Sequence, residues 1–166
     1  MKTLLLIPAI LFCLTCDHAG ATDPASINLS DLTPDSTKVG FHSFQRGKLA
    51  IEGNPIKIKH IPVSNGLYAH APSEVVYDIS GLGYKTFRGK AGLEDEAWGE
   101  VRFKIIGDGK TLWESNIIKK EKKQMPAKAG DFLINISNVS KLQLVVDDLG
   151  NGFSDHSVWI KPELLK

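Results

Sequence analysis

Apolar and polar residues alternate in several short stretches of this chain, and this alternation restricts the possible folds more than any other feature. Val101, Phe103 and Ile105 fall on one face of an extended segment, and segment 142–146 repeats the pattern. Alternation with a period of two is typical of a β-strand that buries one face. No stretch shows an apolar period of about 3.6 residues over the length of a helix. The chain is therefore expected to be all-β.

Turn-forming residues separate these stretches. Gly107-Asp108-Gly109 follows the first stretch and predicts a hairpin that returns through residues 111–115. Further strands are predicted at 39–41, 56–60, 74–79, 132–136 and 158–160. About eight short strands separated by Gly, Pro, Asn and Asp favour two packed antiparallel sheets, so we expect a β-sandwich or jelly roll.

The N-terminus has the features of a signal peptide. Lys2 precedes an apolar run over 4–14, and Ala19-Gly20-Ala21 offers small side chains for cleavage. The run is too short for a transmembrane segment, which needs about 20 apolar residues. We expect residues 1–21 to be removed on export, residues 22–37 to form an entry segment, and residues 38–166 to form one domain.

Both cysteines lie in the expected signal peptide, at Cys13 and Cys16. The mature chain is therefore expected to have no disulfide. Cys16 leaves lipid attachment as an alternative, but the preceding Cys13-Leu14-Thr15 fits a lipoprotein signal poorly. Secretion or periplasmic export without a lipid is favoured.

Charge is nearly balanced, with 20 basic and 19 acidic residues. This balance argues against a nucleic-acid partner or an anionic membrane surface and favours a neutral ligand. The basic run 119–123 is interrupted by Glu121 and is interpreted as a solvated loop.

Polar and aromatic residues outside the predicted strands gather in three loops: GLYAHAPS (66–73), GLEDEAWG (92–99) and DDLGNGFSDHSVW (147–159). Loops at one end of a sandwich can form a single site although they are distant in sequence. The candidate ligand-binding residues are His70, Glu94, Asp95, Glu96, Trp98, Asp155, His156 and Trp159.

This residue set suits a sugar. Hydroxyl groups donate to carboxylates, while the apolar face of a pyranose packs on an aromatic ring, here Trp98 or Trp159. Each residue also has a structural interpretation. His70 can be a hydrogen-bonded histidine near a strand start, and residues 94–96 can be a solvated acidic turn.

The third loop also has oxygen ligands for a cation. Asp147, Asp148, Asn151 and Asp155 are candidate ligands for Ca²⁺, which takes six to eight oxygens. Their spacing does not match an EF-hand, and turns select Asp, Asn and Gly for conformational reasons as well. No cofactor is required by the sequence, and calcium is left as one possibility.

Catalysis is not expected. Asp155-His156-Ser157 contains the letters of a triad, but neighbouring residues of an extended chain point to opposite faces. Glu94 and Glu96 could form a carboxylate pair, although nothing nearby indicates a cleft that would distort a sugar.

Several motifs together resemble the NPCBM family, which is grouped with family 51 carbohydrate-binding modules. They are GLYAHAPSEVVYDISG, YKTFRGKAGLEDE, VRFKIIGDGKTLWES, LQLVVDD and DHSVW, in the family's order. The resemblance implies a galactose-binding-domain-like β-sandwich, commonly attached to glycoside hydrolases, that recognises galactose or related terminal sugars.

By the same resemblance, the family's histidine falls on His70, its acidic cluster on residues 94–96, and its terminal motif on Asp155, His156 and Trp159. Glu94 stands where the family more often has Asp, so the sugar preference is open. We expect no catalytic domain to accompany the module, in which case a partner hydrolase would be encoded separately. The alternative function is an interaction module that holds a protein partner, and a glycan array distinguishes the two.

Export can be tested directly. We expect the mature protein to begin near Thr22, because small side chains at positions 19 and 21 are what the signal peptidase reads. N-terminal sequencing of the exported protein measures this. A mature chain that begins at a lipid-modified Cys16 would contradict the expectation.

Overall fold

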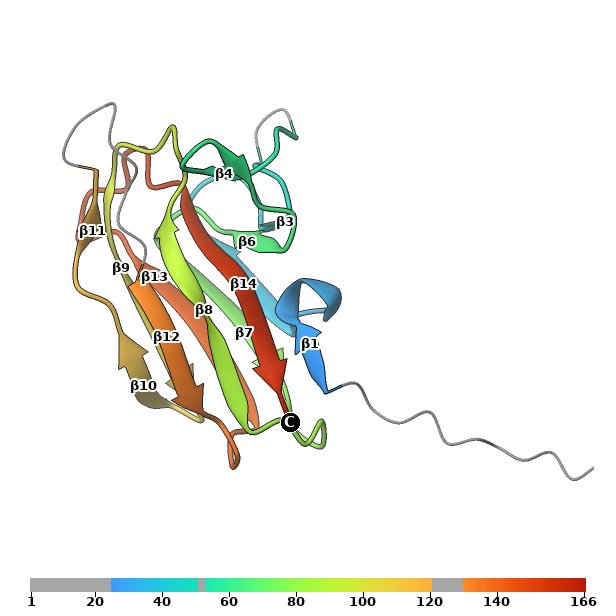
Figure 1. Ribbon diagram of the computed structural model, residues 1–166. Helices are drawn as coiled ribbons and strands as arrows, with labels where there is room; N and C mark the ends of the chain where they lie inside the picture. Colours follow the sequence, from blue (N-terminus) through green and yellow to red (C-terminus); the bar gives the residue numbers. More distant parts are fainter. Residues whose placement is uncertain (1–24, 51–52, 121–129) are drawn as a thin grey trace, which may run out of the picture.

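Two antiparallel sheets pack face to face (Figure 1). The structure is a computed structural model that describes residues 25–50, 53–120 and 130–166. The first sheet has the order β12-β8-β14-β6-β3, with β1 beside β14. Its strands are β1 (Ser26–Asn28), β3 (Gln45–Arg46), β6 (Gly66–Tyr68), β8 (Thr86–Leu93), β12 (Gly130–Asn135) and β14 (Ser157–Leu165).

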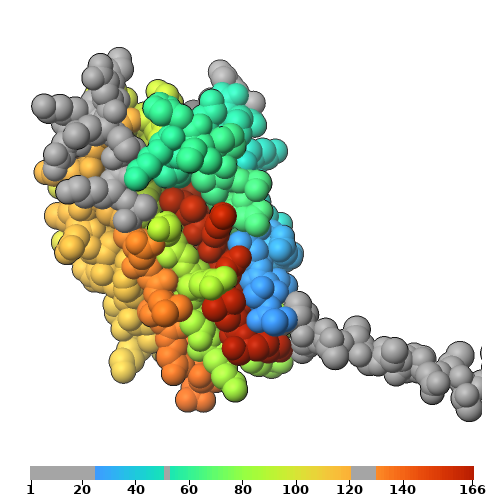
Figure 2. All heavy atoms as spheres, viewed as in Figure 1, coloured from blue at the N-terminus to red at the C-terminus, as the bar shows by residue number. Residues whose placement is uncertain are grey.

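The second sheet has the order β10-β9-β13-β7-β2, with β11 beside β9. Its strands are β2 (Ser36–Val39), β7 (Ser73–Asp78), β9 (Glu100–Gly107), β10 (Lys110–Glu114), β11 (Ile118–Lys119) and β13 (Lys141–Asp147). A separate hairpin pairs β4 (Lys57–Ile58) with β5 (Ile61–Pro62), and Leu29–Asp31 form the 3₁₀ helix η1. In Figure 2, β12, β8 and β14 lie side by side below the hairpin. The expected all-β sandwich is confirmed.

The core fills the space between the sheets, and the alternation in the sequence identifies its residues. In β9, Val101, Phe103 and Ile105 are fully buried. Trp159 of β14 meets Phe103 edge-on with ring centroids 5.0 Å apart and lies 5.9 Å from Phe132 of β12. Three aromatic rings from both sheets thus pack together at the centre of the sandwich.

The segment expected as an entry segment is part of the sandwich. Residue Ser26 pairs with Leu165 in the β1–β14 ladder, and β2 pairs with β7 from Ser36 onward. Leu29 of η1 is completely buried. The sandwich therefore begins before the predicted boundary at residue 38, because Pro, Ser and Asp in the predicted entry segment mark short turns between strands.

The last strand also runs further than predicted. β14 continues through Pro162 to Leu165, with a register shift between Ile160 and Glu163. Lys161 adopts a φ of 46° at this irregularity. Proline lacks the N–H that a ladder requires, so it is tolerated in a strand at such a bulge. Within the described residues, no helix has the length and apolar character needed to span a bilayer.

A glycine in β8 allows the core to close. Gly89 pairs with Phe132, and a Cβ there would lie 2.7 Å from the Phe132 ring and 3.1 Å from the carbonyl oxygens of Ile160 and Lys161. We expect Gly89→Ala to lower the free energy of unfolding by about 1–3 kcal/mol, the usual cost of overpacking a core. Denaturant unfolding measures this.

Gly130→Ala in the neighbouring strand is the control. Its added Cβ would lie 3.4 Å from the Trp113 ring, an ordinary van der Waals contact. Equal unfolding midpoints for the two variants would contradict the packing argument.

Candidate functional site

Main-chain hydrogen bonds join the three polar loops at one end of the sandwich, shown at the top of Figure 1. The Ala71 N–H donates to the Asp155 carbonyl at 3.2 Å. The Glu94 N–H donates to the His156 carbonyl at 2.9 Å, and the Trp98 N–H donates to the Ser154 carbonyl at 3.1 Å. Loop 148–156 is therefore hydrogen-bonded to both of the others, and the expected convergence is present.

A pocket opens between the first and third loops and the end of β2. Its volume is about 470 Å³. We call it the terminal pocket, and it is lined by Gly40, Phe41, His70, Ala71, Pro72, Gly152, Phe153, Ser154 and His156. Two phenyl rings border it with large exposed areas, Phe41 at 51% and Phe153 at 75%. The lining has no Lys, Arg, Asp or Glu side chain.

His70 lies against the base of this pocket. The side chain is buried, and Nδ1 is 2.8 Å from the Ala71 carbonyl oxygen. A carbonyl only accepts, so Nδ1 carries the proton and Nε2 of the neutral ring is left as an acceptor. Burial lowers the pKa of His70 more than the contact with Ala71 raises it. The ring is therefore held neutral, with one free acceptor nitrogen.

His156 contacts His70 on one side and an acidic residue on the other. The two imidazole centroids are 5.6 Å apart. On the other side, Nδ1 of His156 is 3.7 Å from a carboxylate oxygen of Glu94. Glu94 is buried, and the same oxygen accepts from the Glu96 N–H at 2.8 Å. Burial, with a smaller contribution from Glu94, raises the pKa of nearby Tyr68 to about 12. Glu94 therefore lies behind His156 and does not line the terminal pocket.

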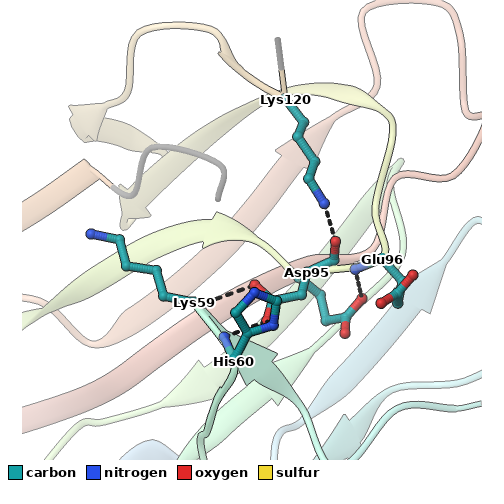
Figure 3. Close-up of polar contacts among 6 residues, drawn as sticks. Lys59, His60, Asp95, Glu96 and Lys120 are labelled. Atoms are coloured by element: carbon teal, nitrogen blue, oxygen red, sulfur yellow. Dashed lines mark hydrogen bonds and ion pairs between the residues drawn. The ribbon is translucent and has the colours of Figure 1, made fainter. Parts of the chain in front are cut away.

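Asp95 fastens the β4–β5 hairpin to the second loop (Figure 3). Its carboxylate oxygens accept from the Lys59 N–H at 2.7 Å and the His60 N–H at 2.6 Å. Both residues have positive φ, 53° and 63°. Lys120 donates to the Asp95 carbonyl. The predicted sugar acceptor therefore holds a strained turn and does not line the terminal pocket, and Glu96 beside it points to solvent.

The two candidate aromatic platforms lie in different environments. Trp98 is 48% exposed, and the ammonium of Lys120 lies 6.0 Å from the centroid of its ring. Trp159 is only 1% exposed and packs in the core. The interpretation of Trp159 as a surface under a sugar ring is therefore wrong, because its inward position on β14 buries the whole indole.

Asp155 is also removed from the ligand-binding set by burial. Its exposure is 0%, and Oδ1 accepts from the Glu100 N–H at 3.1 Å. A Cβ on Gly99 would lie 1.5 Å from that oxygen, so only glycine fits there. Oδ2 has no hydrogen-bond partner in the structure. Burial raises the pKa of Asp155 to about 7.

The predicted calcium ligands are used within turns. Asp147 Oδ1 accepts from the Leu149 N–H at 3.0 Å, and Asp148 Oδ1 accepts from the Gly150 N–H at 3.1 Å. The Asn151 N–H donates to the Asp148 carbonyl. In the described part of the chain, His, Cys, Asp and Glu form no group of three or more that could hold a metal. These residues, together with buried Asp155, do not fit a shared calcium site.

Two residues of the pocket rim were not among the sequence candidates. Phe41 follows β2, at the end of the predicted strand 39–41, and Phe153 lies in the third loop outside the predicted ligand-binding set. Phe153 follows Gly152 in a loop rich in glycine and aspartate. A large aromatic residue in such a loop has few apolar neighbours that could bury it, so the sequence alone could have indicated that Phe153 is exposed.

The family model described as the NPCBM/NEW2 domain matches residues 25–165. The chain belongs to this family. No curated protein sequence matches it significantly.

Solved structures agree with this NPCBM/NEW2 assignment. CBM51 from Clostridium perfringens GH95, in complex with methyl-galactose, is 26% identical with a TM-score of 0.71, and the match covers 84% of this chain and 99% of that one. CBM51-2 in complex with GlcNAc, with the INT domains of C. perfringens ZmpB, gives the same identity and TM-score over 85% of this chain. The match spans only 31% of that longer chain. Tandem CBM51 modules of Streptococcus pneumoniae Sp3GH98 share the fold, with a TM-score of 0.71 and 21% identity. The match covers 85% of this chain and 47% of that one.

The raised pKa of Asp155 predicts that this residue makes stability depend on pH. Its folded-state pKa of about 7 is above the ordinary value of 3.8. Between these values the folded state binds a proton that the unfolded state has lost, so this group makes stability fall as pH rises from about 4 to about 7. Asp155→Asn should remove this contribution while keeping the acceptor for Glu100.

The measurement is the thermal midpoint of both proteins from pH 4 to pH 8. The variant should gain stability relative to the parent as pH rises. His70 contributes the opposite slope in both proteins, and the comparison cancels it. A constant difference between the two curves would show that Asp155 is ionised throughout.

Proposed function

We propose that this NPCBM/NEW2 protein is an exported, non-catalytic carbohydrate-binding module that holds a galactose-type terminal sugar in the terminal pocket. The observation that carries this proposal is the pocket itself, with exposed phenyl rings of Phe41 and Phe153 around a buried, neutral imidazole. A pyranose has an apolar face for the rings and hydroxyl groups for the acceptor nitrogen.

The electrostatics of the pocket favour a neutral ligand. No charged side chain lines it, and the pKa of His70 is lowered. A carboxylate or phosphate on the ligand would lose its hydration without gaining a cationic partner. The sugar is therefore uncharged at the position that the pocket contacts.

The relatives support the same class of ligand. The CBM51 structure that holds methyl-galactose matches this chain over 99% of its own length, so the comparison concerns a whole module of similar size. A related CBM51 holds GlcNAc. We favour a galactose-type sugar as the ligand of this chain, because the module that is matched over 99% of its length holds methyl-galactose, whereas the chain that holds GlcNAc is matched over only 31%.

Contacts around the third loop argue against hydrolysis by a serine triad. Ser157 is fully buried, and its hydroxyl donates to the Ala69 carbonyl. Asp155 contacts the Glu100 N–H rather than the neighbouring imidazole. Asp155 and Ser157 therefore have separate partners and do not form a triad with His156. A glycoside hydrolase is the proposed partner of this module.

Binding can be tested with methyl galactoside by isothermal titration calorimetry. We expect Phe153→Ala to weaken binding by about tenfold, equivalent to about 1.4 kcal/mol, because the variant loses the stacking face. His70→Ala should weaken it by a similar factor through loss of the acceptor nitrogen.

Leu133→Ala is the matched control. Leu133 is 71% exposed, close to the 75% of Phe153, but it lies on β12 outside the terminal pocket. It should bind like the parent. Parent-like binding by folded Phe153→Ala and His70→Ala would place the site elsewhere, and a blank glycan array with the parent would favour the protein-interaction alternative.

A further inference from the structure

A second hollow lies on the outer face of the second sheet, beside the terminal pocket. Its volume is about 390 Å³. We call it the sheet groove. The lining residues that matter here are Lys38, Pro72, Glu74, Lys104, Val145 and Asp147. They come from four neighbouring strands and from the turn before β7.

Strand register explains the shape of the sheet groove. Lys38 of β2 pairs with Glu74 of β7, Glu74 pairs with Val145 of β13, and Val145 pairs with Lys104 of β9. Directly paired residues point to the same face of a sheet. These four side chains therefore form a row across it. The short Val145 between the longer Glu74 and Lys104 makes an apolar floor with polar walls.

The basic and acidic side chains that line the sheet groove are equal in number. Lys38 and Lys104 are basic, while Glu74 and Asp147 are acidic. The Lys104 ammonium is 3.6 Å from the Asp147 carboxylate, with the two side chains 29% and 39% exposed. Donors and acceptors thus stand close together without a net charge. This arrangement suits a neutral, hydroxyl-rich ligand, which needs both kinds of partner.

Pro72 connects the sheet groove to the terminal pocket, because it lines both hollows. The proline is exposed and lies two residues after His70. A ligand that leaves the terminal pocket on this side meets the ring of Pro72 and then the floor at Val145. The shared proline places the two hollows next to each other.

We propose that the sheet groove is a second saccharide subsite, which holds the sugar unit that follows the terminal one. The inference rests on the proposed function of the terminal pocket. Glu74 and Asp147 accept from hydroxyls, Lys38 and Lys104 donate to them, and the Val145 methyl groups pack on the apolar face of the ring. The ligand class is therefore a neutral oligosaccharide ending in galactose, and the protein distinguishes it from the free monosaccharide.

The test compares methyl galactoside with galactose-terminated di- and trisaccharides that cover the α1,3, β1,3 and β1,4 linkages, by titration calorimetry. We expect one linkage to bind at least about fivefold tighter than methyl galactoside. Val145→Phe, which fills the groove, should abolish this gain without changing the affinity for the monosaccharide. Glu74→Gln should reduce the gain, because a neutral acceptor makes a weaker hydrogen bond than a carboxylate.

Gln143→Phe is the control. Gln143 is partly exposed on the same strand, two residues from Val145 and outside the groove, so this variant should keep the full gain. If methyl galactoside binds but no oligosaccharide binds more tightly, or if Val145→Phe keeps the gain, the second subsite is wrong and the proposed function stands. If none of the sugars binds the parent protein, the proposed function itself fails.

Discussion

The main chain of loop 148–156 determines the arrangement of the three polar loops at one end of the sandwich, because it is hydrogen-bonded to loops on both sides. Its carbonyl groups accept from Ala71, Glu94 and Trp98. Asp155 fixes this loop from within, through the Glu100 N–H and the close approach of Gly99. The positions of His70 and His156 depend on these bonds, since the two histidines come from different loops and meet only where the loops are joined.

The fold was predictable from the sequence where one face of a strand is buried and the other is solvated. β9 shows this pattern along its whole length, with Val101, Phe103 and Ile105 buried and the residues between them partly exposed. Prediction was weaker for β14, in which four successive residues from Ser157 are buried. Val158 and Ile160 of this strand pack with Tyr68 and Ile56 on the outer side, so β14 is covered on both faces. A strand of this kind carries no alternation that tells which side an individual residue faces.

The site was predictable in its loops but not in all of its residues. The grouping of three polar loops followed from their composition and from the end-to-end topology of a sandwich. The roles of the acidic residues did not, because a carboxylate that binds a sugar and one that accepts backbone N–H groups look the same in a sequence. Asp95 depends on the turn at Lys59 and His60, some 35 residues away. Exposure of Phe41 and Phe153 is likewise a property of the folded loops.

The pairing of Ser26 with Leu165 brings the two ends of the folded domain to one point. This point lies at the lower end of the sandwich in Figure 1, whereas the loop between β13 and β14, which contributes residues to the terminal pocket, lies at the upper end. A polypeptide joined at either of these ends would leave the domain on the side away from the terminal pocket. A domain with this arrangement of its ends can be placed inside a longer chain without the attached parts covering the terminal pocket.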